Sequence, residues 1–372
     1  MSHVLFISHA RGVHGAEAVM VQAVNACAAA GARVTVVVPS IAPDEGLETA
    51  LVGISRLRLL ALPYRASGVS NVRTRLVQVY NIPALLWLNK YVQREQVDTV
   101  YSCSSITVLG AALARMTGIR HIWHWHESVD THFGWNTSLR PLYRRLALRA
   151  TTLICISHQQ QEDWERELGV ALSNVQVVYN PMKPIPSKPH DSSLAHKEVR
   201  VGFIGHFEAR KNIPMLVQAF ERLHAEFPDT ALWLCGANSE EDRLCVERMT
   251  ALHEPEIKVL PQTADVAAFY HQIDILVLPS WRETMPLVVP EAMQAGVCVL
   301  QTDRSGMKER IEDGTESLFF PPDEPDTLHA LLVRCMDANY RKNISEAGQK
   351  KAMQLIKNES FGQQIQSLIC AS

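Results

Sequence analysis

Two glutamates, Glu283 and Glu291, stand eight positions apart in the stretch WRETMPLVVPEAMQAG, residues 281–296. An apolar strand precedes this stretch, and Pro290 is suited to begin a helix. Glu291 would then lie in the first turn, where the helix dipole alone favours an acid by roughly 0.3–1 kcal/mol. Glu283 lies in the loop, where that explanation does not apply. A loop carboxylate beside backbone amides that Pro286 helps to fix can hold a ligand rich in hydroxyl groups.

A second chemical stretch is FIGHFEARKNIPM, residues 203–215. Lys211 comes directly before a predicted helix in which Pro214 suits the first turn, and an ammonium beside a helix N-terminus suits a phosphate group. Arg210 and Lys211 could instead be solvated surface charges. An earlier glycine loop, SHARGVHGAEAVM (8–20), fits neither the dinucleotide nor the P-loop fingerprint, so a plain turn is an equal alternative.

Histidines gather at the end of a third apolar strand, in RHIWHWHESVD (120–130). Alternation along a strand places His124 and His126 on one face. The pair could ligate a metal together with Asp130 and His132, which would indicate a metal-dependent hydrolase. It could equally be a pair of hydrogen-bonded core histidines.

The composition is that of a soluble globular protein. The 372 residues are 47% hydrophobic and 20% charged with a net charge of −3, which excludes a disordered or nucleic-acid-coating chain. Residues 1–180 carry 16 basic and 12 acidic residues, and residues 181–372 carry 20 and 27. Eight scattered cysteines without a C-x-x-C pair indicate buried free thiols. With no leader-like start and no run of eighteen apolar residues, we expect a cytoplasmic protein without a membrane span.

Short apolar strands alternate with helix-length segments along the whole chain, which predicts an α/β fold with doubly wound parallel sheets. The pattern pauses in a stretch rich in Pro and Ser, residues 181–198, and then restarts. We therefore expect a first domain over 1–180, a linker over 181–198 and a second domain over 199–355. We also expect a last helix over 356–372, which could cross back to the first domain. Ligands of such sheets bind beyond the strands' carboxyl ends, here in a cleft between the two facing domains.

The chain resembles the retaining glycosyltransferase family 4, also described as glycosyl transferases group 1, which has the GT-B fold of two Rossmann-like domains. The E-x7-E stretch followed by SGMKERIEDG (305–314) is similar to its donor-site signature. The other matching stretches, in chain order, are HGAEAVM, WHWHES, ICISHQQQEDW, VVYNPM and IGHFEARKN. The resemblance implies a nucleotide-sugar donor bound mainly by the second domain, an acceptor bound mainly by the first, and no cofactor. It also implies no need for a metal, and no D-x-D motif occurs in the sequence.

The resemblance assigns three catalytic residues. Lys211 would neutralise the donor's diphosphate, Glu283 would lie at the transferred sugar, and His126 would lie beside the reacting carbon. Glu291 would accept hydrogen bonds from the ribose. The remaining predicted donor-binding residues are Gly15, His206, Arg210, Gln262, Thr284, Met285, Leu287 and Val288. The last three would contribute backbone amides around the sugar and phosphates, and the backbone near Gln262 would face the base.

Three departures from the family pattern stand out. His206 replaces the phosphate-loop arginine, so either Arg210 supplies the charge or the donor binds more weakly. Met285-Pro286 replaces a Phe-Gly, and Asn180-Pro181 replaces an Asn-Gly.

The resemblance implies transfer of a sugar to a glycan or lipid-linked acceptor, in the setting of bacterial cell-surface polysaccharide. A nucleotide-sugar epimerase, or another non-transferring enzyme of the same fold, is the alternative. A non-catalytic sugar-binding protein is a further one.

A basic segment covers residues 56–94, with Leu85, Leu86, Trp87, Leu88 and Tyr91 interleaved among Arg56, Arg58, Arg65, Arg73, Arg75, Lys90 and Arg94. It could be two amphipathic helices packed on the sheet with a solvated basic face. It could instead rest on an anionic bilayer and place the protein peripherally at the inner face of the plasma membrane.

Overall fold

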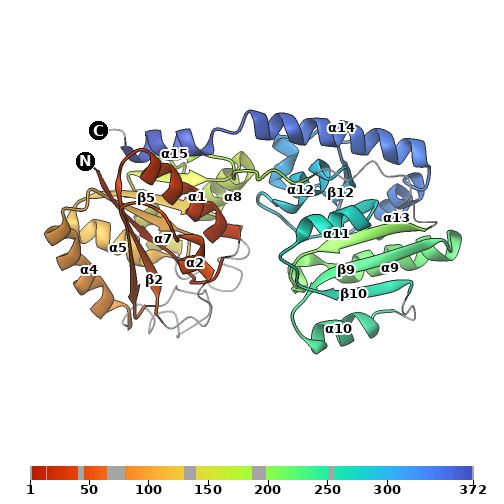
Figure 1. The fold of residues 1–372 in the computed structure, drawn as a ribbon, viewed down its shortest axis with the longest axis horizontal. Coiled ribbons are helices and arrows are strands. Elements are labelled where there is room, and N and C mark those ends of the chain that lie inside the picture. Colours follow the sequence, from red (N-terminus) through yellow and green to blue (C-terminus); the bar gives the residue numbers. More distant parts are fainter. Residues whose placement is uncertain are drawn as a thin grey trace. The chain divides into compact units, whose positions relative to one another are not determined.

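The computed structural model describes residues 2–13, 15–40, 46–64, 80–129, 140–186, 198–250 and 255–370. The chain divides into two compact units (Figure 1). Unit 1 comprises Met1–Pro181 together with Ser360–Ser372, and unit 2 comprises Met182–Glu359. The change of unit falls at the start of the stretch rich in Pro and Ser, of which residues 187–197 lie outside the described part.

The described part of unit 1 forms a parallel sheet of seven strands, in the order β3-β2-β1-β4-β5-β6-β7. The strands are β1 (His3–Ile7), β2 (Arg33–Pro39), β3 (Leu57–Leu62), β4 (Thr99–Cys103), β5 (Arg120–Trp125), β6 (Thr152–Cys155) and β7 (Val175–Val177). The helices are α1 (Gly15–Ala29), α2 (Gly46–Ala50), α4 (Ile82–Glu95), α5 (Val108–Thr117), α7 (Arg140–Ala147), α8 (His158–Leu168) and α15 (Phe361–Cys370).

Alternation along β1 explains why helices cover both faces of this sheet. Val4 and Phe6 pack in a cluster with α1 and α15, whereas Leu5 and Ile7 pack in a cluster with α4 and α5. A strand that is buried on both faces reads as a continuous apolar run, as β1 does. The predicted doubly wound class is therefore confirmed for unit 1.

The C-terminal helix α15 completes unit 1 and lies beside α1 (Figure 1). The Gln366 amide donates to the Ala26 carbonyl at 2.8 Å, and the Arg120 guanidinium donates to the Leu368 carbonyl at 2.8 Å. The boundary expected at residue 355 falls within the preceding helix, which continues to Lys357.

The described part of unit 2 forms a second parallel sheet, in the order β10-β9-β8-β11-β12-β13. Its strands are β8 (Val199–Ile204), β9 (Thr230–Ala237), β10 (Ile257–Pro261), β11 (Ile275–Leu278), β12 (Cys298–Thr302) and β13 (Leu318–Phe320). Its α-helices are α9 (Ile213–Glu226), α10 (Glu240–Glu247), α11 (Val266–Gln272), α12 (Val288–Gln294), α13 (Pro325–Arg334) and α14 (Ala338–Lys357).

The basic segment differs from the two helices predicted for it. Its beginning is the edge strand β3, because Leu57–Leu62 pairs in parallel with β2. Residues 65–79, with Arg65, Arg73 and Arg75, lie outside the described residues. Helix α4 forms its end, as predicted. No helix in the described parts of the chain has both the length and the apolar composition of a membrane span.

Candidate functional site

In unit 2 the carboxyl ends of the neighbouring strands β8 and β9 approach each other closely. A Cβ atom on Gly236 would lie 2.1 Å from the Gly205 carbonyl oxygen, and Gly236 has φ +126°. Only glycine fits this combination of backbone angle and contact. The approach fixes the start of the loop that leads from Gly205 through the short 3-10 helix η3 (Ala209–Lys211) to α9.

Lys211 and Glu283 meet at this edge of the sheet. The Lys211 ammonium donates to the Glu283 carboxylate, Nζ to Oε1, at 2.5 Å, and the Ser280 hydroxyl donates to the same oxygen at 2.6 Å. Both residues are 8% exposed. Because an isolated buried charge is costly, each side chain serves as the counterion of the other.

The loop that carries Glu283 is fixed by its backbone as well. The Glu283 amide donates to the Arg304 carbonyl at 2.9 Å, and the Gly306 amide donates to the Glu283 carbonyl at 3.1 Å. The Trp281 amide donates to the Arg210 carbonyl at 3.0 Å, which joins this loop to the one that carries Lys211. The loops after three strands therefore set the position of one carboxylate.

Glu291 lies on α12, which begins at Val288, two residues before the predicted start. The Tyr270 hydroxyl donates to Glu291 Oε2 at 2.9 Å. Burial raises the pKa of the Glu291 carboxyl above its ordinary range, although Tyr270 and Lys183 act in the opposite direction. A carboxylate held by one donor keeps acceptor capacity for hydroxyl groups.

Two other predicted donor-binding residues, His206 and Arg210, lie in the loop that carries Lys211. His206 is half-buried, and its ring Nδ1 lies 3.0 Å from Nδ2 of the Asn238 side chain. Arg210 is exposed, pairs with Glu208 at 2.7 Å and lies 3.7 Å from the Glu283 carboxylate, Nη1 to Oε1. Arg210 is thus near enough to add a second positive charge to the Lys211 loop.

The loop before α12 contains the remaining predicted residues. Met285 is buried, whereas Thr284, Leu287 and Val288 are half-buried. Leu287 precedes the first residue of α12, and the first amides of any helix lack acceptors within the helix. Gln262 is exposed directly after β10.

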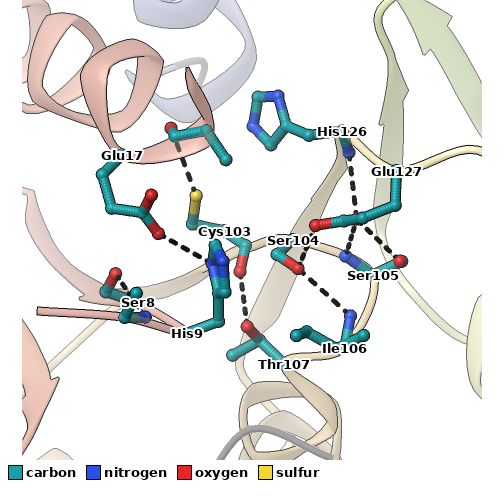
Figure 2. Close-up of polar contacts among 12 residues, drawn as sticks. Ser8, His9, Glu17, Cys103, Ser104, Ser105, Ile106, Thr107, His126 and Glu127 are labelled. Atoms are coloured by element: carbon teal, nitrogen blue, oxygen red, sulfur yellow. Dashed lines mark hydrogen bonds and ion pairs between the residues drawn. The ribbon is translucent and has the colours of Figure 1, made fainter. Parts of the chain in front are cut away.

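In unit 1 a polar cluster occupies the corresponding carboxyl edge, where loops after β1, β4 and β5 meet the start of α1 (Figure 2). Gly15 is the first residue of α1, and a Cβ atom there would meet no atom within 4 Å. The open space at Gly15 agrees with a loop that another molecule can approach.

The carboxylate of Glu127, which lies two residues after the end of β5, accepts hydrogen bonds from the loop after β4 (Figure 2). The Ser104 hydroxyl donates to Oε1, and the Ser105 amide and hydroxyl donate to Oε2 at 2.8 and 2.7 Å. Burial alone would raise the pKa of Glu127, but the neighbouring His9 and His126 and the hydrogen bonds from the two serines lower it to about 2. Glu127 is therefore a fixed anion at neutral pH.

His126 follows β5 and is half-buried beside this anion. Burial lowers the pKa of His126 to about 4, against the opposing effect of Glu127 and Glu17. Its ring lies 4.0 Å from the ring of His124, centroid to centroid, and the Tyr101 hydroxyl lies 2.5 Å from His124 Nδ1. His126 is thus a neutral imidazole at pH 7, able to act as hydrogen-bond donor or acceptor.

His9 and Glu17 form an ion pair that the sequence analysis did not identify as part of the site. His9 Nδ1 lies 2.8 Å from Glu17 Oε1, and the Glu17 side chain is fully buried (Figure 2). Burial would lower the pKa of His9, but the hydrogen bond to Glu17 raises it above its ordinary value. An acidic residue amid the apolar letters of the α1 sequence was the signal for this pair.

The protonated thiol in this cluster does not suit a metal ion. His9, Glu17 and Cys103 lie close enough to share an ion. Burial raises the pKa of the Cys103 thiol well above its ordinary value, and the thiol donates to the Ala16 carbonyl at 3.5 Å. A metal-binding cysteine is a thiolate. Asp130 and His132, the further ligands suggested with His124 and His126, lie outside the described residues.

Two family models together match nearly the whole chain. Residues 13–184 match the family described as "Glycosyltransferase Family 4", and residues 185–351 match "Glycosyl transferases group 1". The chain belongs to glycosyltransferase family 4. The resemblance inferred from the sequence motifs is confirmed.

Two curated relatives extend this family-4 assignment. The chain is 28% identical over 228 residues to an uncharacterized glycosyltransferase of Haemophilus influenzae, covering 60% of this chain and 63% of that protein. It is 22% identical over 290 residues to the Escherichia coli UDP-Gal:alpha-D-GlcNAc-diphosphoundecaprenol alpha-1,3-galactosyltransferase, covering 73% and 75%.

Solved structures share the GT-B fold of this family-4 protein. The Anabaena protein HepE in complex with UDP-glucose has a TM-score of 0.81 at 19% identity and covers 100% of both chains. The lipopolysaccharide outer core galactosyltransferase WaaB has a TM-score of 0.71 at 16% identity and covers 99% of both chains. The predicted fold class is therefore confirmed for the whole chain.

Proposed function

We propose that the protein transfers a sugar from a nucleoside-diphosphate sugar to a glycan or lipid-linked acceptor, with retention of anomeric configuration and without a metal ion. The buried Lys211–Glu283 pair at the carboxyl edge of the unit 2 sheet is the observation that carries the proposal. It presents an ammonium and a carboxylate together where doubly wound sheets bind their ligands.

The ammonium suits the leaving group. Transfer breaks the bond between the anomeric carbon and the β-phosphate oxygen, so negative charge grows on the departing diphosphate. Lys211 can stabilise this charge, and Arg210 can add to it. The absence of a D-x-D motif agrees with a charge supplied by side chains rather than by a metal.

The glutamates have separate roles in this proposal. Glu283, held by Lys211 and Ser280, accepts hydrogen bonds from hydroxyl groups of the transferred sugar. Glu291 binds the ribose hydroxyls. The amides of Met285, Leu287 and Val288 hold the sugar and phosphates, while His206 and Gln262 lie at the diphosphate and the base.

Retention follows from attack on the face that the diphosphate leaves. The acceptor oxygen bonds to the anomeric carbon as the bond to phosphate breaks, and the acceptor proton passes to the departing phosphate oxygen. His126 is neutral at pH 7, so it can hydrogen-bond the reacting sugar without competing with Lys211 for negative charge. Gly15 leaves space for the diphosphate at the first loop of unit 1.

The setting that we propose is bacterial cell-surface polysaccharide synthesis at the inner face of the membrane. The E. coli relative carries a diphosphoundecaprenol acceptor in its name. Helix α4 exposes an apolar group of side chains near its start, namely Ile82, Leu86 and Trp87. Lys90 on the same helix is exposed, so α4 can contact an anionic bilayer.

A panel of nucleoside-diphosphate sugars, screened by the thermal shift of the full chain, tests the proposal. A ligand that binds only the folded state raises the melting temperature. We expect at least one donor to do so and to be consumed when a lipid-linked or glycan acceptor is added. Failure of every nucleotide sugar to shift the wild-type protein would contradict the proposed donor class.

A further inference from the structure

A second charged site lies on unit 1, between α7 and α8. A pocket of 510 Å³ is lined by Arg144, Arg145, Leu148, Arg149 and Gly169, together with Arg140, Pro141, Arg166, Glu167 and Leu168. We name it the α7 basic pocket. Five arginines and one carboxylate line it, so its lining is strongly cationic.

Two of these arginines are neutralised by protein carboxylates. Arg140 pairs with Glu167, and Arg166 pairs with Asp163 at 3.0 Å. Arg144, Arg145 and Arg149 are exposed, and none of the ion pairs among the described residues includes them. The α7 basic pocket therefore has about three positive charges without a counterion among the described residues.

Some exposed arginines of unit 2 differ from these three. In unit 2, exposed arginines reach exposed acids, in the pairs Arg222–Asp326, Arg243–Glu240 and Arg248–Glu241. The helix dipole explains some preference for cations at the end of α7, worth roughly 0.3–1 kcal/mol. The dipole does not explain why Arg145 and Arg149 lie four positions apart, since like charges at that spacing repel each other.

The pocket is separate from the site described above. Leu148 and Arg149 lie between α7 and the start of β6, and Gly169 caps the end of α8. These connections reach the amino edge of the sheet, whereas His126 and Glu127 follow the carboxyl end of β5. A neighbouring hollow of 320 Å³ shares Arg149 and adds Arg115.

We propose that the α7 basic pocket binds a phosphomonoester or diphosphate group. A guanidinium group can donate two parallel N–H hydrogen bonds to phosphate oxygens, and a phosphomonoester carries about two negative charges at neutral pH. Three guanidinium groups without an ion pair in the described part of the chain match such a group better than they match the single charge of a phosphodiester. The group can belong to a soluble phosphorylated compound or to a phosphorylated lipid, because Leu148 and Pro141 add apolar surface beside the arginines.

Hydrogen–deuterium exchange of the full chain, titrated with inorganic pyrophosphate, tests the proposal locally. We expect slower exchange in residues 140–149 and 166–169, separately from any effect in unit 2. Replacement of Arg144, Arg145 and Arg149 by Ser is expected to raise the concentration for half-protection by on the order of a thousandfold, at about tenfold for each guanidinium.

The matched control replaces Arg222, Arg243 and Arg248 by Ser, which removes the same charge and should leave the titration unchanged. Equal midpoints in the two triple variants, or no protection at α7 in the wild type, would overturn the proposal. Vesicles with phosphatidic acid identify the source. Pyrophosphate-sensitive retention of the wild type on them indicates a lipid-borne group, and pyrophosphate binding without retention indicates a soluble one.

Discussion

The Lys211 ammonium lies 2.5 Å from the Glu283 carboxylate, and each side chain is almost wholly shielded from water. The two residues are 72 positions apart and follow different strands of one sheet. The family-4 protein thus holds a positive and a negative group together at the place where its donor is proposed to bind. Five predictions follow from this geometry and from that of unit 1.

Alanine substitutions of the two donor-site glutamates are predicted to have different effects. Glu291→Ala should weaken binding of a free nucleoside diphosphate about tenfold or more, because hydrogen bonds to the ribose are lost. Glu283→Ala should impair transfer and leave nucleoside diphosphate affinity nearly unchanged. Calorimetric titration and steady-state kinetics on both variants give the comparison. Equal losses of nucleotide affinity would show that this division of roles is wrong.

Gly236→Ala is predicted to damage the Lys211 loop. The new Cβ would lie 2.1 Å from the Gly205 carbonyl oxygen, so the ends of β8 and β9 must separate. Thermal unfolding should show a loss of more than about 2 kcal/mol, and nucleotide binding should weaken. Gly314→Ala is the control, because Gly314 also has positive φ but a Cβ there meets no atom within 4 Å. A control as damaging as Gly236→Ala would argue that backbone angle alone matters.

Stability is predicted to fall in mild acid through His126. Its pKa in the folded protein is about 4, whereas an unfolded histidine titrates near about 6.5. The unfolded chain therefore binds the proton first, so lowering the pH from about 6.5 to 4 favours unfolding, by a few kcal/mol at most. In His126→Gln the free energy of unfolding should fall less over that range. Parallel curves for wild type and variant would show that His126 does not titrate in this way.

Helix α4 is predicted to bind anionic vesicles. Leu86 and Trp87 are 52% and 41% exposed, and Lys90 is exposed beside them. Co-sedimentation at low salt should be lost when Leu86 and Lys90 are replaced by Ser, and should weaken at high salt for the wild type. Met353→Ser with Lys342→Ser, on unit 2, removes the same kinds of group and should retain binding. Identical sedimentation of the two double variants would leave α4 as an ordinary packed helix.

Only part of the basic segment keeps its charge free for such contact. Arg33, Arg58 and Arg94 converge on Glu95, and Arg58 and Arg94 also lie over the Tyr91 ring. Counting charges along residues 56–94 overestimated the cationic face, because two of its arginines, Arg58 and Arg94, share the Glu95 carboxylate.

The fold was largely predictable because each strand is a short apolar run and each connection is of helix length. Strand β3 escaped prediction since Leu57–Leu62 carries Arg58 and is an edge strand in which four residues are half-buried and two are exposed. Lys211 and Glu283 were found from strand-end position and motif. Their direct contact was not, since two residues 72 positions apart meet only through sheet order. His9, Glu17 and the serines that hold Glu127 were missed for the same reason.

Sequence reasoning also could not detect that Ser104 adopts φ +80°. A non-glycine residue in this region is uncommon, and here the conformation accompanies the hydrogen bond that the Ser104 hydroxyl donates to Glu127.

The most direct test of the proposed function is the effect of Lys211→Ala on sugar transfer, measured as kcat/KM with the donor that the nucleotide-sugar panel identifies. Removal of the ammonium should lower kcat/KM by at least about a hundredfold, because a charge-assisted contact to a departing diphosphate is worth a few kcal/mol. Lys342→Ala, which removes an exposed lysine of α14, should have no effect, and thermal unfolding should confirm that both variants are folded. Turnover of folded Lys211→Ala at the wild-type rate would contradict the assignment of this edge of unit 2 as the donor site.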